Sequence, residues 1–106
     1  ITIMDTLVKL IGTDGFVLYT YTLQDTATAR AVFNELARRL KNFNRQEEVY
    51  TTDSLTFRMK YIYGVTLFEH DSKSILNLFD KKGYPVLSES GEPGSLDDMY
   101  LDIQAR

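Results

Sequence analysis

Residues 55–63, Leu-Thr-Phe-Arg-Met-Lys-Tyr-Ile-Tyr, alternate between apolar and polar side chains more regularly than any other part of this chain. One side of the alternation carries Leu55, Phe57, Met59, Tyr61 and Tyr63. The other side carries Thr56, Arg58 and Lys60, and Ile62 is the exception. A period of two predicts a β-strand with one face on a core and the other toward water or a partner. Because helical stripes occur elsewhere in the chain, this strand predicts an α+β fold.

The length and composition fit one globular domain. The chain has 106 residues, of which 43% are hydrophobic and 25% charged, so it can bury a core without metals or disulfides. The absence of cysteine excludes disulfides, thiolate zinc sites and cysteine catalysis. Its apolar runs are far shorter than the roughly 20 residues of a membrane helix, and no signal peptide opens the sequence. We therefore expect a soluble, cytoplasmic protein that does not enter a membrane.

Acidic residues are concentrated at the C-terminal end. From residue 88 onward there is one base, Arg106, against the acids Glu89, Glu92, Asp97, Asp98 and Asp102. Residues 88–95, Ser-Glu-Ser-Gly-Glu-Pro-Gly-Ser, are typical of a flexible linker, and a short acidic and apolar segment follows. The sequence therefore predicts a single α+β domain over residues 1–87 and a flexible acidic tail over residues 88–106.

The first segment fits two structures. Residues 3–11 carry a helical stripe that Gly12 could end: Ile3, Met4, Leu7, Val8, Leu10 and Ile11. The same residue types also suit a strand, which would form a hairpin across Gly12 to Gly15. The sequence predicts either an extra N-terminal helix or an extra strand here.

The next elements are a strand and a long helix. Residues 16–23 predict a strand, and apolar residues on both of its faces favour a central position in the sheet. Asp25 or Thr26 would cap a helix that ends between Asn42 and Asn44. Its expected buried stripe is Ala29, Val32, Phe33, Leu36, Leu40 and Phe43.

The second half predicts a strand pair, a helix and a final strand. A strand over residues 48–52 would turn at Asp53-Ser54 into the strand from Leu55, which could run to Phe68 with an interruption at Gly64. Asp71 or Ser72 would then cap a second helix, stopped by Gly83, with a stripe of Ile75, Leu76, Leu78 and Phe79. Residues 84–87 would form an edge strand, because Pro85 cannot donate a hydrogen bond. The resulting β-α-β-β-α-β order predicts a ferredoxin-like (split βαβ) sheet with two helices on one face.

No constellation of residues predicts a catalytic, cofactor or metal site. The single histidine, His70, lies between Glu69 and Asp71, but neighbours on a strand point to opposite faces and do not converge. Its surroundings lack the ligand spacing of a metal site and any nucleophile motif. The glycine pairs at residues 12–15 and 91–94 lack the order of a phosphate-binding loop.

Three groups of side chains are candidates for partner binding. The long helix carries an Arg-rich set that could meet phosphate or an acidic surface: Arg30, Arg38, Arg39, Lys41 and Arg45. Arg58 and Lys60 would lie on an exposed sheet face. In the tail, Met99, Tyr100 and Leu101 offer apolar area for docking on a basic surface.

These features lead to three functional hypotheses. The first is a small non-enzymatic binding or regulatory protein, of the inhibitor or immunity type, that contacts a protein partner and forms a homodimer through a sheet face or edge. The second is a nucleic-acid-binding domain that uses the Arg-rich helix or the exposed sheet face. The third is a small dimeric α/β-barrel enzyme.

Overall fold

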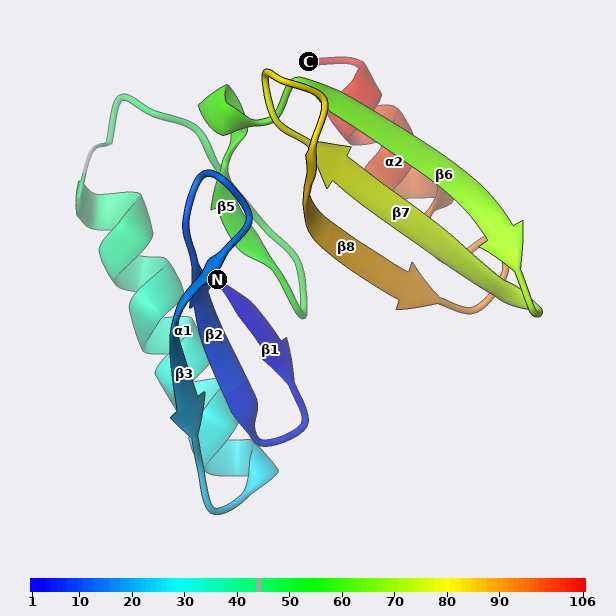
Figure 1. Cartoon of the computed structure of the whole chain (residues 1–106). Coiled ribbons are helices and arrows are strands. Elements are labelled where there is room, and N and C mark those ends of the chain that lie inside the picture. The colour runs from blue at the N-terminus through cyan, green and yellow to red at the C-terminus, as the bar shows by residue number, and fades with distance from the viewer. Residues whose placement is uncertain (44) are drawn as a thin grey trace. The chain divides into compact units, whose positions relative to one another are not determined.

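The computed structural model describes residues 1–43 and 45–106 and confirms an α+β fold, with three antiparallel sheets and two α-helices in these residues (Figure 1). The chain forms two compact units. Unit 1 contains Ile1–Gly12 and Phe16–Lys60, and unit 2 contains Thr13–Gly15 and Tyr61–Arg106. No helix in the described part of the chain is both long and apolar enough to cross a membrane.

Unit 1 opens with a three-stranded antiparallel sheet in the order β1-β2-β3. The strands are β1 (Thr2–Met4), β2 (Leu7–Ile11) and β3 (Val17–Thr22). The helical alternative for residues 3–11 is therefore wrong, and the strand alternative is confirmed, with a hairpin closed by Gly12 N–H donating to Phe16 O at 2.9 Å. Asp5, at φ 53°, turns the chain between β1 and β2. That turn splits the apparent helical stripe between two strands.

Helix α1 (Thr26–Phe43) packs on this sheet (Figure 1). Asp25 caps it as predicted, because its Oδ1 accepts a hydrogen bond of 2.7 Å from the Thr28 N–H. The centre of the core is formed by Val8, Ala29 and Phe33, which are at most 1% exposed. Packed around them are Ile1, Ile3, Tyr21, Leu23, Val32 and Leu36. Phe43, predicted to be buried, is 84% exposed at the last turn of α1, and Asn44 lies outside the described residues.

A short strand pair completes unit 1. Strands β4 (Val49–Thr51) and β5 (Thr56–Arg58) pair antiparallel, as the sequence predicts. The strand from Leu55 does not continue to Phe68, however, because the chain turns into the 3₁₀ helix η1 (Met59–Tyr61). The predicted polar face is also wrong at Thr56, which is fully buried and whose N–H donates to Ile1 O. This segment lies along β1, where it covers the outer edge of that strand.

Unit 2 is built on a second three-stranded antiparallel sheet, in the order β6-β7-β8. Its strands are β6 (Gly64–His70), β7 (Lys73–Phe79) and β8 (Pro85–Gly91). The helix predicted from Asp71 is wrong, because that segment is β7, with Ser74, Leu76 and Leu78 buried on one face. Asp71 and Ser72, at φ 53° and 63°, form a two-residue hairpin turn instead of a helix cap. The ferredoxin-like order is therefore not confirmed.

The last residues are structured as part of unit 2. The predicted boundary at residue 88 falls inside β8, where Ser88, Glu89 and Ser90 pair with β7. Helix α2 (Asp97–Gln104) then packs against β6 (Figure 1). Leu96 and Ile103 are 9% and 5% exposed. Burial of these two side chains ties the segment predicted as a flexible tail to its sheet. The edge position predicted for the strand that carries Pro85 is confirmed.

Candidate protein-binding edge

Strand β3 lies at one edge of the unit 1 sheet and presents apolar side chains to solvent. Among the described strands it pairs only with β2. Phe16, Val17, Leu18 and Tyr19 are 74%, 50%, 72% and 57% exposed. The sequence predicted a central strand because both faces are apolar here, and that position is wrong. The apolar residues that a neighbouring element was expected to cover are instead open along the strand.

The backbone of β3 also has hydrogen-bonding groups that face away from β2. Leu23 N–H donates to Thr6 O at 2.9 Å, next to the facing pair Leu7 and Thr22. In an antiparallel ladder the bonded residues alternate, so Tyr21 exchanges hydrogen bonds with Val8 while the N–H and C=O of Thr20 and Thr22 point to the outer edge. An edge of this kind is a template for an added strand.

This edge carries neither charge nor proline, two of the devices that normally prevent edge pairing, and its one irregularity is the β-bulge at Leu18. No charged residue occurs between Asp14 and Asp25. By contrast, β6 carries Glu69 and His70, and β8 carries Pro85 and Glu89. Charge and proline at an edge disfavour the addition of another strand. We name the exposed residues of this stretch, Phe16, Val17, Leu18, Tyr19, Thr20 and Thr22, the β3 edge.

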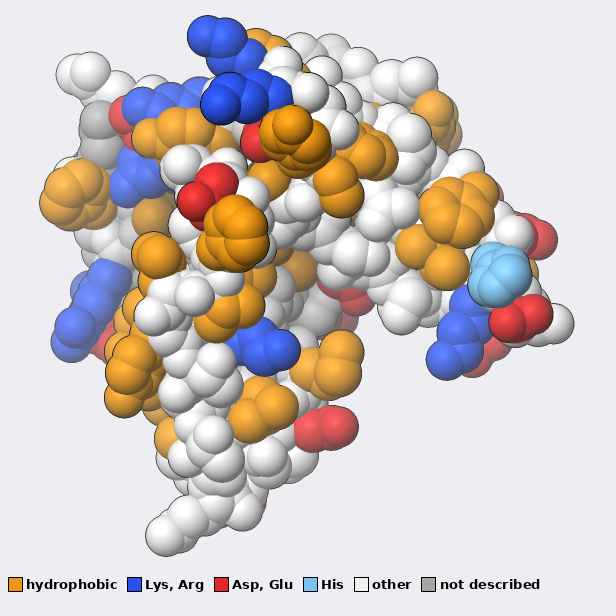
Figure 2. Space-filling view, in the orientation of Figure 1, with side chains coloured by type: hydrophobic (Ala, Val, Ile, Leu, Met, Phe, Trp, Pro, Cys, Tyr) orange, Lys and Arg blue, Asp and Glu red, His pale blue; other side chains and the backbone are white. Residues whose placement is uncertain are grey.

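Figure 2 shows hydrophobic side chains reaching the surface over the part of unit 1 where Figure 1 places β1, β2 and β3. Met4, on β1, adds to them at 74% exposure. Scattered apolar residues are normal on a protein surface, but four consecutive exposed apolar residues, Phe16 and the first three residues of β3, are not. The β3 edge is therefore the candidate functional site.

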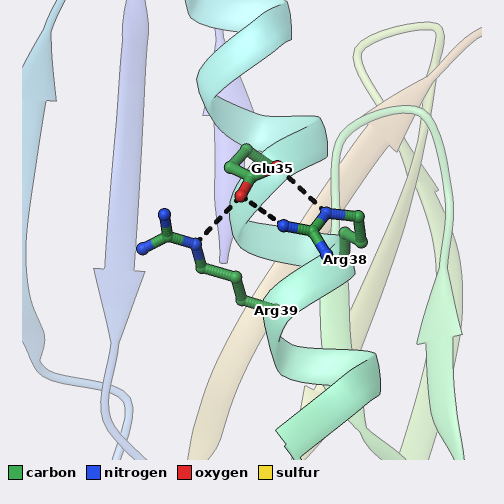
Figure 3. Close-up of polar contacts among 3 residues, drawn as sticks. All are labelled: Glu35, Arg38 and Arg39. Carbon is green, nitrogen blue, oxygen red and sulfur yellow. Dashed lines mark hydrogen bonds and ion pairs between the residues drawn. The ribbon is translucent and has the colours of Figure 1, made fainter.

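The Arg-rich set on α1 is partly neutralised within the helix. The carboxylate of Glu35 accepts hydrogen bonds from Arg38 at 2.6 and 3.0 Å and from Arg39 Nε at 3.0 Å (Figure 3). These bonds, from Arg38 first and then Arg39, lower the pKa of Glu35 to about 2 and raise the pKa of Arg38. One carboxylate thus engages two of the predicted binding cations.

A second carboxylate, Glu47, engages the two cations predicted on the exposed sheet face. Lys60 Nζ lies 2.7 Å from Glu47 Oε1, and Arg58 pairs with Glu47 Oε2. Hydrogen bonds from Lys60 and then Arg58 lower the pKa of Glu47. The Arg58 side chain is only 12% exposed, and its guanidinium lies over the Phe43 ring at 5.4 Å from the centroid. Arg58 is therefore a packed ion-pair residue, and the sheet face predicted for it is not open.

The remaining members of the Arg-rich set are separated along α1. Arg30, near its start, donates to Asp53 O at 2.5 Å and lies over the Phe33 ring. It also lines an open depression of about 460 Å³ with Ile3, Asp5, Thr26 and Ala27. Lys41 is exposed in the last turn of α1, whereas Arg45, predicted on the same helix, is exposed beyond its end at Phe43. The structure thus groups Arg38 with Arg39 and Arg58 with Lys60, and places Arg30 apart.

The apolar residues predicted for docking in the tail differ in exposure. Met99 and Tyr100 are half-buried, while Leu101 is 59% exposed. The side chains that attach α2 to unit 2 are Leu96 and Ile103, which are apolar residues of the predicted tail and were not expected in a core. Their spacing of seven residues, two helical turns, was the available signal.

His70 lies at the surface, at the end of the β6-β7 hairpin (Figure 2). Its Nε2 is 3.2 Å from Asp71 Oδ2, and both side chains are mostly exposed, at 70% and 87%. Across residues 1–43 and 45–106, no three His, Asp or Glu side chains come together in a way that could hold a metal ion. That His70 is neither catalytic nor a metal ligand stays a prediction from the sequence.

Comparisons of this chain with protein-family models, with curated proteins and with solved structures found no match.

Proposed function

We propose that this chain is a small non-enzymatic binding protein, a regulator or inhibitor, that acts by protein–protein contact through the β3 edge. The observation that carries the proposal is the combination, on β3, of outward backbone groups at Thr20 and Thr22 with exposed side chains from Val17 to Tyr19, which continue the exposed Phe16. Backbone hydrogen bonds would provide affinity, and the alternating side chains would provide specificity.

The same geometry favours a protein partner over a nucleic acid. Two carboxylates, Glu35 and Glu47, engage Arg38, Arg39, Arg58 and Lys60, so a phosphate would have to compete with existing ion pairs. The β3 edge itself carries no cation. Affinity for nucleic acid rests on uncompensated positive charge and falls steeply with salt. We therefore rank nucleic-acid binding below protein binding.

An enzymatic role has less support from the described side chains. The open depression on unit 1 contains two ionisable residues, Asp5 and Arg30. Arg30 is already engaged by the Asp53 carbonyl. A catalytic site needs titratable groups held at defined distances from one another and shielded from water. An open depression excludes little water.

Site-specific photo-crosslinking tests the proposal. A benzophenone amino acid would replace Leu18 in one variant and Tyr84, which is 62% exposed on unit 2, in a matched control. Both variants would be expressed in cells of the source organism and irradiated. We expect a discrete protein adduct from position 18 that excess wild-type chain competes away, and none from position 84. A nuclease-sensitive adduct, or equal labelling from both positions, would contradict the proposal.

A further inference from the structure

We infer that the β3 edge pairs with the β3 edge of a second copy of this chain, antiparallel and with the two-fold axis at Thr20. This inference rests on the proposed function and specifies the partner of the same site. Its basis is the self-complementarity of the strand in backbone direction, side-chain type and charge.

The backbone sets the allowed registers. Because Leu23 N–H donates to Thr6 O, the outward-facing residues of β3 are Thr20 and Thr22. Two outward residues must face each other to exchange both hydrogen bonds. With the axis at Thr20, each Thr20 exchanges an N–H and a C=O with its equivalent. The extra residue of β3 at the register shift is Leu18, so both outward-facing residues lie in the regular part of the strand, residues 19–22.

The side chains favour this register. It places Tyr19 of one copy opposite Tyr21 of the second copy, in the closely spaced, non-hydrogen-bonded position where side chains interact most. Tyr21 packs against the core of unit 1, and Tyr19 packs on Tyr21 with a centroid distance of 4.7 Å. The pairing would therefore form a cluster of four tyrosines, two from each strand, on the α1 side of the sheet. Aromatic pairs of this kind stabilise a strand pair.

The absence of charge makes the strand compatible with a second copy of itself. A two-fold axis brings each residue close to its own equivalent, so a charged side chain near the axis would repel itself. No charge occurs between Asp14 and Asp25, and the acids at the two ends lie farthest from the axis. The product is one continuous sheet in the order β1-β2-β3-β3-β2-β1, with an α1 helix from each copy on the same face.

Cysteine crosslinking tests the register, because the chain has no native cysteine. In a Thr20→Cys variant, the two Cα atoms of a hydrogen-bonded pair would be about 5.5 Å apart, within the range that a disulfide spans. Thr22→Cys is the matched control on the same face of the same strand. Its two copies would lie about 13 Å apart along the strand. The chain would be oxidised mildly at about 100 µM, a concentration suited to the weak affinity expected of a small interface. We expect Thr20→Cys to form a disulfide-linked dimer at least tenfold faster than Thr22→Cys. Equal rates would overturn the register.

Opposite charges introduced at Thr20 in two variants test the two-fold contact without a covalent bond. Thr20 is exposed, so Thr20→Lys and Thr20→Glu leave the fold of the unit intact. We expect each variant alone to sediment as a monomer and an equimolar mixture to form a heterodimer. A mixture that stays monomeric while the wild type dimerises would overturn the inference. So would photo-crosslinks from position 18 that reach another protein and never a second copy, although protein binding at the edge would then stand.

Discussion

The ring of Tyr19 packs edge to face on the ring of Tyr21, with centroids 4.7 Å apart and an angle of 67° between the ring planes. Tyr21 packs against the core of unit 1. Its ring therefore restricts the orientation of the Tyr19 ring, although Tyr19 is 57% exposed. A partner strand would therefore meet a side chain that has already lost much of its rotamer freedom. Preorganisation of this kind lowers the entropic penalty of binding. The contact connects the core of unit 1 with its open edge.

The carboxyl group of Glu35 should titrate far below the usual range. Its pKa is about 2 against 4.5 for the free side chain, because Arg38 and then Arg39 donate hydrogen bonds to the ionised form. The stabilisation of α1 by these pairs is then complete above pH 4.5 and lost as the pH falls toward 2. Carbon-13 NMR titration of Glu35 provides the measurement. In the double variant Arg38→Gln, Arg39→Gln the midpoint should move up toward the ordinary value; a wild-type midpoint already there would refute the account.

The two phenylalanines of α1 should differ strongly in their contribution to stability. Phe33 is 1% exposed and Phe43 is 84% exposed. Phe33→Ala removes a core side chain and should lower the free energy of unfolding by about 3–5 kcal/mol. Phe43→Ala removes an exposed ring under Arg58 and should lower it by less than about 1 kcal/mol. Urea denaturation followed by tyrosine fluorescence measures both, and similar losses would show that α1 packs differently.

A second matched pair tests whether α2 belongs to unit 2. Ile103 is 5% exposed, and Leu101, two residues earlier on the same helix, is 59% exposed. Ile103→Ala should destabilise the unit by about 2–5 kcal/mol, whereas Leu101→Ala should change its stability by at most about 0.5 kcal/mol. Thermal unfolding monitored by circular dichroism provides the comparison. If neither change has an effect, residues 88–106 are the detachable acidic tail that the sequence predicts.

The sequence predicts correctly those elements whose apolar pattern fits only one type of secondary structure. The strand from Phe16, the Asp25 cap and α1 have clear patterns, and Pro85 predicts an edge strand. The apolar pattern of residues 72–79 fits two types of secondary structure. The stripe of Ile75, Leu76, Leu78 and Phe79 fits a helix, but it also fits a strand with Leu76 and Leu78 on one face and Ile75 and Phe79 on the other. Asp71 and Ser72 adopt the left-handed backbone conformation that forms the hairpin turn before β7. Neither residue type alone predicts that conformation.

The sequence identifies the strand that forms the candidate site but predicts it in the centre of a sheet, whereas it lies exposed at an edge. Apolar residues from Phe16 to Tyr19 predict burial, and the sequence does not tell whether the cover comes from the same chain or from another. The uncharged run up to Asp25 is a better signal, because edge strands that stay free normally carry a charge. The ion pairs of Glu35 and Glu47 were also missed; for Glu47, its partners are more than ten residues away.

Amide hydrogen exchange of the wild-type chain at two concentrations tests the central claim most directly. The N–H groups of Thr20 and Thr22 point away from β2, whereas that of Tyr21 bonds within the sheet. If the β3 edge binds a second copy, the Thr20 and Thr22 amides should exchange rapidly at about 1 µM and at least tenfold more slowly at several hundred micromolar. The Tyr21 amide, the internal control, should be protected at both concentrations. Rapid exchange of Thr20 and Thr22 at every concentration, with Tyr21 still protected, would contradict pairing at this edge.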